Sequence, residues 1–267
     1  MEIYKYFSEE SAVKFLENWC IAFQQPNQFN DPFDCLPNFA RTDGEERKEA
    51  IKKLAQRFFE YGNHSTMEEA LRHGEYFFDW QEKSDAGEAR MYIPGGLFFV
   101  SCFSRTETNL LMWSHYAAKH CGIVVEFDRA APILEKLRPV IYSQKRPSFG
   151  ASKAMASLSK IQDFFYVKSI DWAYEQEERI VLNRADADAF QEQCGHPEIS
   201  SKIKLARIDK PFVKSIFFSG YFLRKYSDKV NSLKLDPDAT DIRIFSSVVD
   251  TEEYKIKSNL IPRESPV

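Results

Sequence analysis

Two glutamates and an arginine alternate along one short segment as Glu175, Glu177 and Arg179. Side chains two residues apart on an extended chain point to the same face, so the segment predicts one charged row. Two like charges at this spacing would raise the pKa of one carboxyl group, which suits acid–base chemistry. Two interpretations stay open. The row lines a cleft, with Tyr174 and Ile180 on the buried face, or it is exposed and Arg179 bridges Glu177.

Three further segments are richer in polar and reactive groups than their apolar surroundings require: Tyr4–Tyr6, Phe29–Cys35 and Ser101–His120. The candidate substrate-binding residues are Lys5, Tyr6, Asn30, Asp34, Ser101, Ser104, Trp113, Tyr116 and Arg179, and the candidate catalytic residues are Glu177, Glu175 and His115. Ser101 and Ser104 fall on opposite faces of a regular strand, so at most one of them faces a common cleft.

The segment Phe29–Cys35 predicts a turn, because Asn30 and Asp31 precede a proline and both side chains bond readily to their own backbone. We expect Phe29 and Phe33 to anchor this turn in apolar contacts while Asp34 faces the cleft. Turn formation alone is the simpler interpretation for Asn30.

The aromatic and histidine candidates also have simpler structural interpretations. Tyr4 and Tyr6 share one face of a predicted strand, where they would pack in the core. His115 lies in a predicted helix with apolar neighbours, where a histidine is more often a hydrogen-bonded core residue than a base. His115 and His120 are spaced too unevenly for one helix face, so no metal site is predicted.

The overall composition limits the classes of function. The 36 Lys and Arg against 40 Asp and Glu give a net charge of −4, which makes nucleic acid an unfavourable main ligand. The five cysteines are widely spaced without a CxxC pair, and they are interpreted as reduced thiols. The first residues are polar and acidic, and no apolar run is long enough for a membrane span, so we expect a cytoplasmic protein without a membrane partner.

Hydrophobic spacing predicts a single α+β domain over residues 1–267, with a mixed, mostly antiparallel central sheet and a helical insertion near 43–90 packed to one side. The central strands are expected at Ile3–Phe7, Leu97–Phe103, Ile123–Phe127 and Arg179–Asn183. Further helices are expected near residues 109–119 and 151–167. No GxGxxG motif follows a predicted strand, and no GxxxxGK[ST] motif is present. Neither a Rossmann dinucleotide site nor a P-loop is therefore predicted.

Three stretches of sequence resemble the bacterial domain-of-unknown-function 2971 family: FNDPFD, CFS followed by NLLMWSHYAAKHCGIVVEFD, and a lysine followed by WAYEQEER. The resemblance runs from Tyr4 to about Tyr254 and implies one domain of that type, without a settled reaction. Glu178 departs from the family pattern, in which an aromatic residue more often follows the position of Glu177.

The order of these stretches is also similar, more distantly, to ADP-ribosyltransferase-type folds. That similarity implies Lys5 or Tyr6 on the first strand, Ser101 or Ser104 on a middle strand, and the segment Glu175–Glu177 on a later one. The implied activity is NAD or nucleotide processing, with NAD as a substrate and a carboxylate that stabilises the oxocarbenium-like ribose. A role in bacterial stress or phage defence would go with it.

Two other classes of function stay open. One is a non-catalytic ligand-binding or regulatory module, which would also act through a protein partner. The other is a metal-dependent nuclease that uses Asp31, Asp34, Glu175 and Glu177, although no Asp…Glu-x-Lys arrangement follows a pair of predicted strands.

Overall fold

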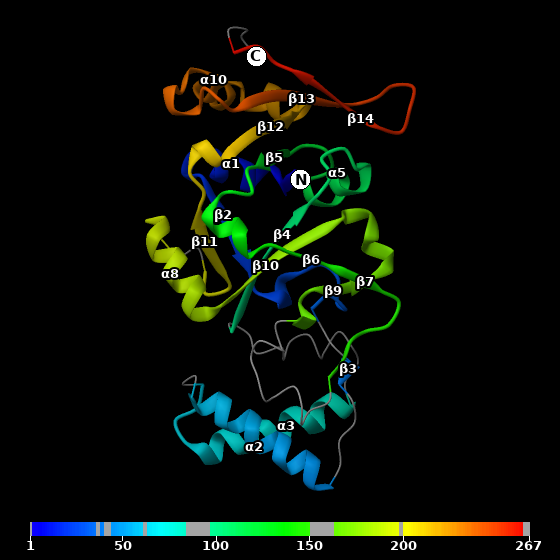
Figure 1. Cartoon of the computed structure of the whole chain (residues 1–267), viewed down its shortest axis with the longest axis vertical. Helices are drawn as coiled ribbons and strands as arrows, with labels where there is room; N and C mark the ends of the chain where they lie inside the picture. Colours follow the sequence, from blue (N-terminus) through cyan, green and yellow to red (C-terminus); the bar gives the residue numbers. More distant parts are fainter. Residues whose placement is uncertain are drawn as a thin grey trace. The chain divides into compact units, whose positions relative to one another are not determined.

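The computed structural model describes residues 2–35, 38–39, 44–60, 63–83, 97–149, 163–197 and 200–263. They form helices and a mixed, mostly antiparallel sheet, which confirms the predicted α+β class (Figure 1). The chain forms two compact units. The sheet unit comprises Met1–Gln24, Phe99–Pro139 and Ala173–Val267, and the helical unit comprises Gln25–Phe98 and Val140–Trp172. That the whole chain acts as one domain stays a prediction.

The ten-stranded sheet has the order β11-β2-β4-β1-β5-β12-β13-β14, with β10 paired to β4 and β6 paired to β10. Its strands are β1 (Ile3–Phe7), β2 (Cys20–Gln24), β4 (Phe98–Ser104), β5 (Ile123–Phe127), β6 (Arg138–Pro139), β10 (Glu177–Asn183), β11 (Ile203–Arg207), β12 (Val213–Ser219), β13 (Arg243–Val249) and β14 (Ile256–Leu260). Strands β12 and β13 pair in parallel. The four expected central strands are all present: β1 and β5 have their predicted bounds, β4 is displaced by one residue, and β10 begins two residues earlier than predicted.

Strand β5 lies at the centre of this sheet, and all five of its residues are buried. It pairs with β1 along its whole length, from Ile3 opposite Phe127 to Phe7 opposite Ile123. Gly122 precedes it, and a Cβ atom at that position would lie 2.0 Å from the Phe7 carbonyl oxygen. The sequence therefore needs glycine here so that two backbones can approach closely.

Among its described residues, the sheet unit contains five helices: α1 (Glu9–Asn18), α5 (Leu110–Tyr116), α8 (Arg184–Cys194), α9 (Gly220–Lys225) and α10 (Ser227–Leu235). Side-chain caps fix where several of them begin. Ser8 caps α1, Asn109 caps α5 and Asn183 caps α8, each accepting a hydrogen bond from a backbone N–H of the first turn. Ser104 through Asn109 thus lead directly from β4 into α5.

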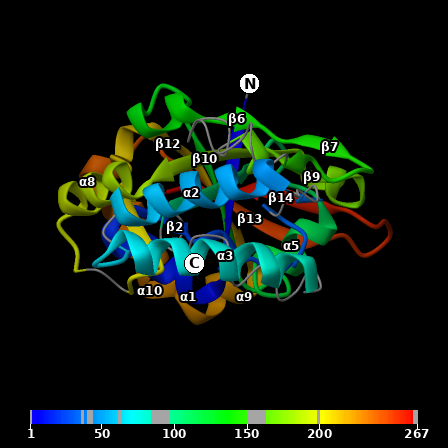
Figure 2. The ribbon, with the colours of Figure 1, turned by 90° about the horizontal axis from the view of Figure 1, so that it is seen from below.

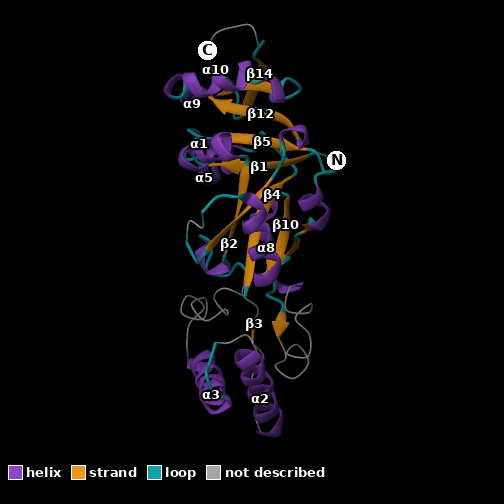
Figure 3. Ribbon diagram, turned by 90° about the vertical axis from the view of Figure 1, so that its left-hand side faces the viewer, coloured by secondary structure: helices purple, strands orange, loops and turns teal. Residues whose placement is uncertain are grey.

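The helical unit contains α2 (Gly44–Glu60) and α3 (Met67–Lys83), which lie side by side (Figures 2 and 3). Ala50, Leu54, Phe58 and Phe77 form a buried apolar cluster in this unit. The helical character predicted near 43–90 is confirmed for these two segments, and residues 84–90 lie outside the described residues. Packing of this insertion to one side of the sheet stays a prediction.

Short parallel strand pairs complete the helical unit: β3 (Asn38–Phe39) with β8 (Ser148–Phe149), and β7 (Ile141–Ser143) with β9 (Val167–Ser169). The helix expected over 151–167 falls outside the described residues as far as 162. Its last three expected residues were wrong, because Phe165 and Tyr166 form a turn and Val167 begins β9, where it pairs with Ile141.

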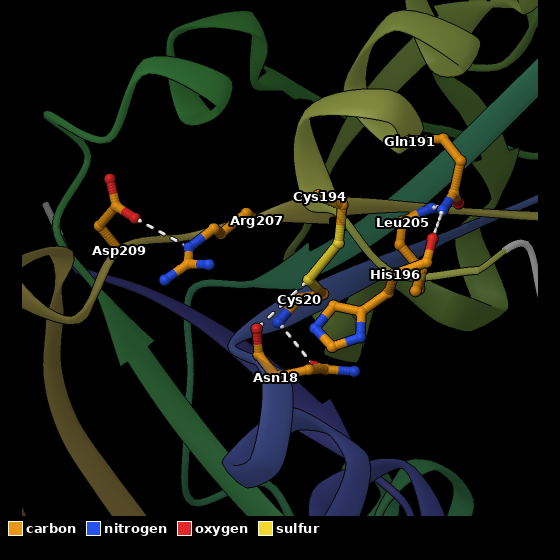
Figure 4. Close-up of a disulfide and its surroundings, with 8 residues drawn as sticks. All are labelled: Asn18, Cys20, Gln191, Cys194, His196, Leu205, Arg207 and Asp209. Atoms are coloured by element: carbon orange, nitrogen blue, oxygen red, sulfur yellow. Dashed lines mark hydrogen bonds and ion pairs between the residues drawn. A yellow bond between two sulfur atoms is a disulfide. The ribbon is translucent and has the colours of Figure 1, made fainter.

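A disulfide links Cys20, the first residue of β2, to Cys194, the last residue of α8 (Figure 4). The prediction that every cysteine is a reduced thiol is therefore wrong for this pair. The pairing of β11 with β2, and the packing of α8 on β11, bring together two cysteines 174 residues apart. Among the described residues, no helix is both long and apolar enough to cross a membrane.

Candidate functional site

Lys5 lies on β1 and extends toward β4, within the sheet unit. Its Nζ atom donates hydrogen bonds to Ser101 Oγ at 2.9 Å and to the Cys102 carbonyl oxygen at 3.0 Å, and it lies 4.9 Å from the centre of the Phe103 ring. Strands β1 and β4 pair only at the register of Tyr4 and Ser104. The ammonium group of Lys5 therefore bridges two strands where their backbone pairing is short.

Glu177 and Arg179 form a bidentate ion pair on one face of β10. Arg179 Nε donates to Glu177 Oε1 at 2.6 Å, and Arg179 Nη2 donates to Oε2 at 2.9 Å. Arg179 is fully buried and Glu177 is 5% exposed, so the interpretation of an exposed charged row is wrong. The predicted bridge between these two residues is present, but it lies inside the protein.

Cys102 connects Lys5 to this ion pair. Its thiol is hydrogen bonded to Glu177, and burial, followed by the charge of Glu177, raises the pKa of the thiol well above its usual range. Burial lowers the pKa of Lys5 to about 8, although the charges of Cys102 and Glu177 oppose this shift. We call Lys5, Ser101, Cys102, Glu177 and Arg179 the Lys5–Glu177 cluster. Lys5 and Cys102 are its partly exposed members.

Glu175 lies outside strand β10, which corrects the prediction of a continuous row. It ends a 3-10 helix, Ile170–Glu175, and Gln176 has a φ of 47°, in the left-handed region. The extended backbone on which Glu175 and Glu177 would share a face is therefore interrupted between them. The buried carboxylate of Glu175 accepts a hydrogen bond from the Tyr116 hydroxyl at 2.6 Å.

Ser104 and Asn109 hold this turn in place. Ser104 Oγ donates to the Glu175 carbonyl oxygen at 2.6 Å, and Asn109 Nδ2 donates to the Tyr174 carbonyl oxygen at 3.3 Å. Ser101, in contrast, belongs to the Lys5–Glu177 cluster. The two serines of β4 thus have different partners, and that at most one of them faces a common cleft stays a prediction.

The aromatic candidates pack on the other face of β1. The Tyr6 hydroxyl donates to the Thr106 carbonyl oxygen at 2.9 Å, and its ring meets the Trp113 ring edge-on at 6.0 Å. Trp113 is buried, and its Nε1 atom donates to the Glu107 carbonyl oxygen at 2.6 Å. These contacts give both residues a packing role. His115 is exposed on α5, beside the ring of Tyr116.

Asp34 lies in the helical unit, where it forms a buried ion pair with Lys168. Its Oδ2 atom is 3.5 Å from Lys168 Nζ, and the Lys168 ammonium lies 5.0 Å from the centre of the Trp172 ring. The sequence signal was a single lysine within the apolar run Phe164–Ile170. Asp31 shapes the turn, as its Oδ1 atom accepts a hydrogen bond from the Phe33 backbone N–H at 2.8 Å.

The expectation that Phe33 anchors this turn in apolar contacts is wrong. Phe33 is 52% exposed, and its ring lies 5.7 Å from the Arg146 guanidinium carbon. Asn30 is exposed as well, as expected for a turn residue. Over the described part of the chain, no group of three or more His, Cys, Asp or Glu residues could hold a metal ion.

Glu178 has a defined role on the opposite face of β10. It accepts hydrogen bonds from Arg105 Nε at 2.6 Å and from both terminal nitrogens of Arg129, at 2.6 and 3.0 Å. Burial would raise the pKa of Glu178, but the hydrogen bonds from Arg129 and Arg105 outweigh it and lower the pKa. The two adjacent glutamates of β10 therefore have separate arginine partners.

Comparisons of the chain with family models, with curated proteins and with solved structures found no match. The chemistry of the Lys5–Glu177 cluster is therefore the basis for a functional proposal. It combines an oriented carboxylate, a guanidinium group and an amine of lowered pKa within the sheet unit.

Proposed function

We propose that the chain is an enzyme of ADP-ribosyltransferase type that acts on NAD or a related nucleotide, with Glu177 as its catalytic carboxylate. The observation that carries this proposal is the bidentate ion pair of Glu177 and Arg179 beside Cys102 and Lys5. An arginine that holds both carboxylate oxygens fixes the orientation of the group before substrate binds. Preorganised charge of this kind is among the largest contributions to catalysis.

In the proposed reaction, the bond between nicotinamide and ribose breaks, and its electron pair leaves with nicotinamide. The ribose becomes oxocarbenium-like, and the negative charge of Glu177 stabilises it. An acceptor hydroxyl or water then attacks the ribose and releases a proton. Lys5, which is mostly protonated below pH 8, would pair with the pyrophosphate through its ammonium group.

The test is an NAD-consumption assay on the wild type, Glu177→Gln and Glu178→Gln. The change at Glu177 keeps the shape and removes the charge, so the rate should fall by roughly 10²-fold. Glu178 is the matched control, because it is adjacent, buried and bound by arginines on the opposite face of the strand. Glu178→Gln should keep most of the activity. A wild type that consumes no NAD, with or without candidate acceptors, contradicts the proposal.

A ligand-binding or regulatory module without catalysis is the second candidate. The complete burial of Arg179 favours it, since a substrate would have to reach Glu177 past Lys5 and Cys102. In that case ADP-ribose or NAD should raise the melting temperature without any turnover. Membership of the domain-of-unknown-function 2971 family, a cytoplasmic location and a role in bacterial stress or phage defence are part of the same proposal, supported by the sequence resemblance.

A further inference from the structure

A separate cavity of about 270 Å³ lies in the sheet unit, where the end of β11 meets α8 and the beginning of the 3-10 helix Pro132–Lys136. Its lining is largely apolar and includes Ile133, Phe190, Ile208 and Phe212, with Arg207 and Asp209 as its charged residues. Ile133 and Ile208 are buried in the core, whereas Phe190 and Phe212 are only partly buried. The cavity therefore has a largely apolar lining that includes two aromatic rings, and one pair of opposite charges.

The two charged residues form an exposed ion pair. Arg207 Nε donates to Asp209 Oδ1 at 3.2 Å, and the two side chains are 55% and 66% exposed (Figure 4). An ion pair with this exposure contributes about 0–1 kcal/mol to stability. Arg207 and Asp209 can therefore give up this contact and pair with charged groups of a ligand at little cost in free energy.

We propose that this cavity binds a free α-amino acid with an apolar or aromatic side chain. The ligand carboxylate would accept hydrogen bonds from Arg207, and the ligand ammonium would donate to Asp209. The ligand side chain would lie between Phe190 and Phe212. A zwitterion keeps both protein charges paired, whereas a simple acid or amine brings an additional unbalanced charge to the site.

The size of the cavity agrees with a ligand of this class. Small-molecule sites commonly have volumes of about 300–1,000 Å³, and this cavity, at about 270 Å³, is slightly below that range, which suits an amino acid and not a dinucleotide. This ligand is therefore distinct from the nucleotide of the proposed function, and its residues are distinct from the Lys5–Glu177 cluster.

The helix that carries Phe190 is fixed to its neighbours before any ligand binds. Gln191 Nε2 donates to the His196 carbonyl oxygen at 2.7 Å, and Gln191 Oε1 accepts from the Leu205 N–H at 2.8 Å (Figure 4). The disulfide holds the last residue of the same helix. Because α8 is already held in place, binding of a ligand beside Phe190 has a smaller cost in conformational entropy.

Isothermal titration of the full-length protein with L-phenylalanine and L-leucine tests the proposal. We expect saturable binding of at least one of them, and affinities about 10-fold or more lower for 3-phenylpropanoate, phenylethylamine and glycine, each of which lacks one recognised group. Arg207→Gln and Asp209→Asn should each weaken binding by about 10-fold or more.

The control variant is Asp188→Asn. Asp188 on α8 forms an ion pair with Lys204 on β11, with 2.7 Å between Oδ1 and Nζ, and neither residue lines the cavity. It should bind the amino acid as the wild type does. Melting temperatures check that each variant is folded. Absence of saturable binding of both amino acids to the folded wild type overturns the proposal. Binding that is unchanged in Arg207→Gln and Asp209→Asn, or equal affinity for 3-phenylpropanoate, also overturns it.

Discussion

The carboxylate of Glu177 and the guanidinium group of Arg179 meet through two hydrogen bonds of 2.6 and 2.9 Å, and neither residue is more than 5% exposed. A buried pair of this kind is stable only while both partners are present, because the loss of one leaves a charge in a poorly solvated environment. The same contact thus supports the fold of β10 and orients the proposed catalytic group.

Replacement of Arg179 by methionine should therefore destabilise the protein strongly. We expect the free energy of unfolding to fall by about 3–5 kcal/mol, because the Glu177 charge loses its arginine. Urea denaturation measures this change. Glu177→Leu combined with Arg179→Met should recover much of the loss, since the double variant buries no charge. Lys14→Met is the control, because it breaks an exposed ion pair with Glu10 and should change stability by less than about 1 kcal/mol.

The titration of Lys5 should contribute to the pH dependence of stability. Its pKa is about 8 in the folded protein and 10.5 in the ordinary reference state, so between these values the unfolded chain binds more protons. Stability of the wild type should therefore rise from pH 8 to 10.5 relative to Lys5→Met. Urea midpoints of both proteins across this range measure the difference. Parallel pH profiles would show that Lys5 keeps its ordinary pKa.

Removal of the disulfide should destabilise the fold. Cys20→Ser together with Cys194→Ser should lower the free energy of unfolding by about 2–4 kcal/mol, because the crosslink restricts a long segment of the unfolded chain. Reduction of the wild type should lower its melting temperature to the value of this double variant. Cys121→Ser, at a partly exposed thiol outside the disulfide, is the control. A wild type that is unaffected by reduction would contradict the crosslink.

Gly122 should not tolerate a side chain. Gly122→Ala places a Cβ atom 2.0 Å from a backbone oxygen, so two central strands must separate. We expect a loss of about 1–3 kcal/mol or more, measured by thermal or urea denaturation. Gly220→Ala is the control, because the nearest atom to its Cβ would be the flexible end of Arg224 at 3.5 Å. Equal effects of the two substitutions would show that the close approach of β1 to Gly122 is absent.

The sequence predicted the parts of the fold whose hydrophobic patterns are strong. Strand β5 is an unbroken apolar run except for Glu126, and β1 alternates regularly, so both were found at their correct bounds. Helix α8 was missed because its buried positions are few and small, with only Ala187, Gln191 and Cys194 buried. The hydrophobic period that identifies a helix is weak in such a segment.

The candidate site was predicted in part, because its members interact across the sheet. The Glu177–Arg179 pair followed from a two-residue spacing on one strand. The position of Glu175 did not, because a left-handed backbone at Gln176, a residue type that seldom adopts it, has no sequence signal. The partners of Asp34 and Cys20 were missed for another reason, since both contacts join residues far apart in the sequence.

The path of the chain has a practical consequence for work with this protein. The polypeptide passes from one compact unit to the other four times, after Gln24, Phe98, Pro139 and Trp172, and one passage lies inside strand β4 itself. No contiguous fragment can therefore contain either unit in full without also containing residues of the other. A truncation after Trp172 removes the five strands from β10 to β14 and also Cys194, the disulfide partner of Cys20. Functional dissection must therefore rely on point substitutions in the intact chain.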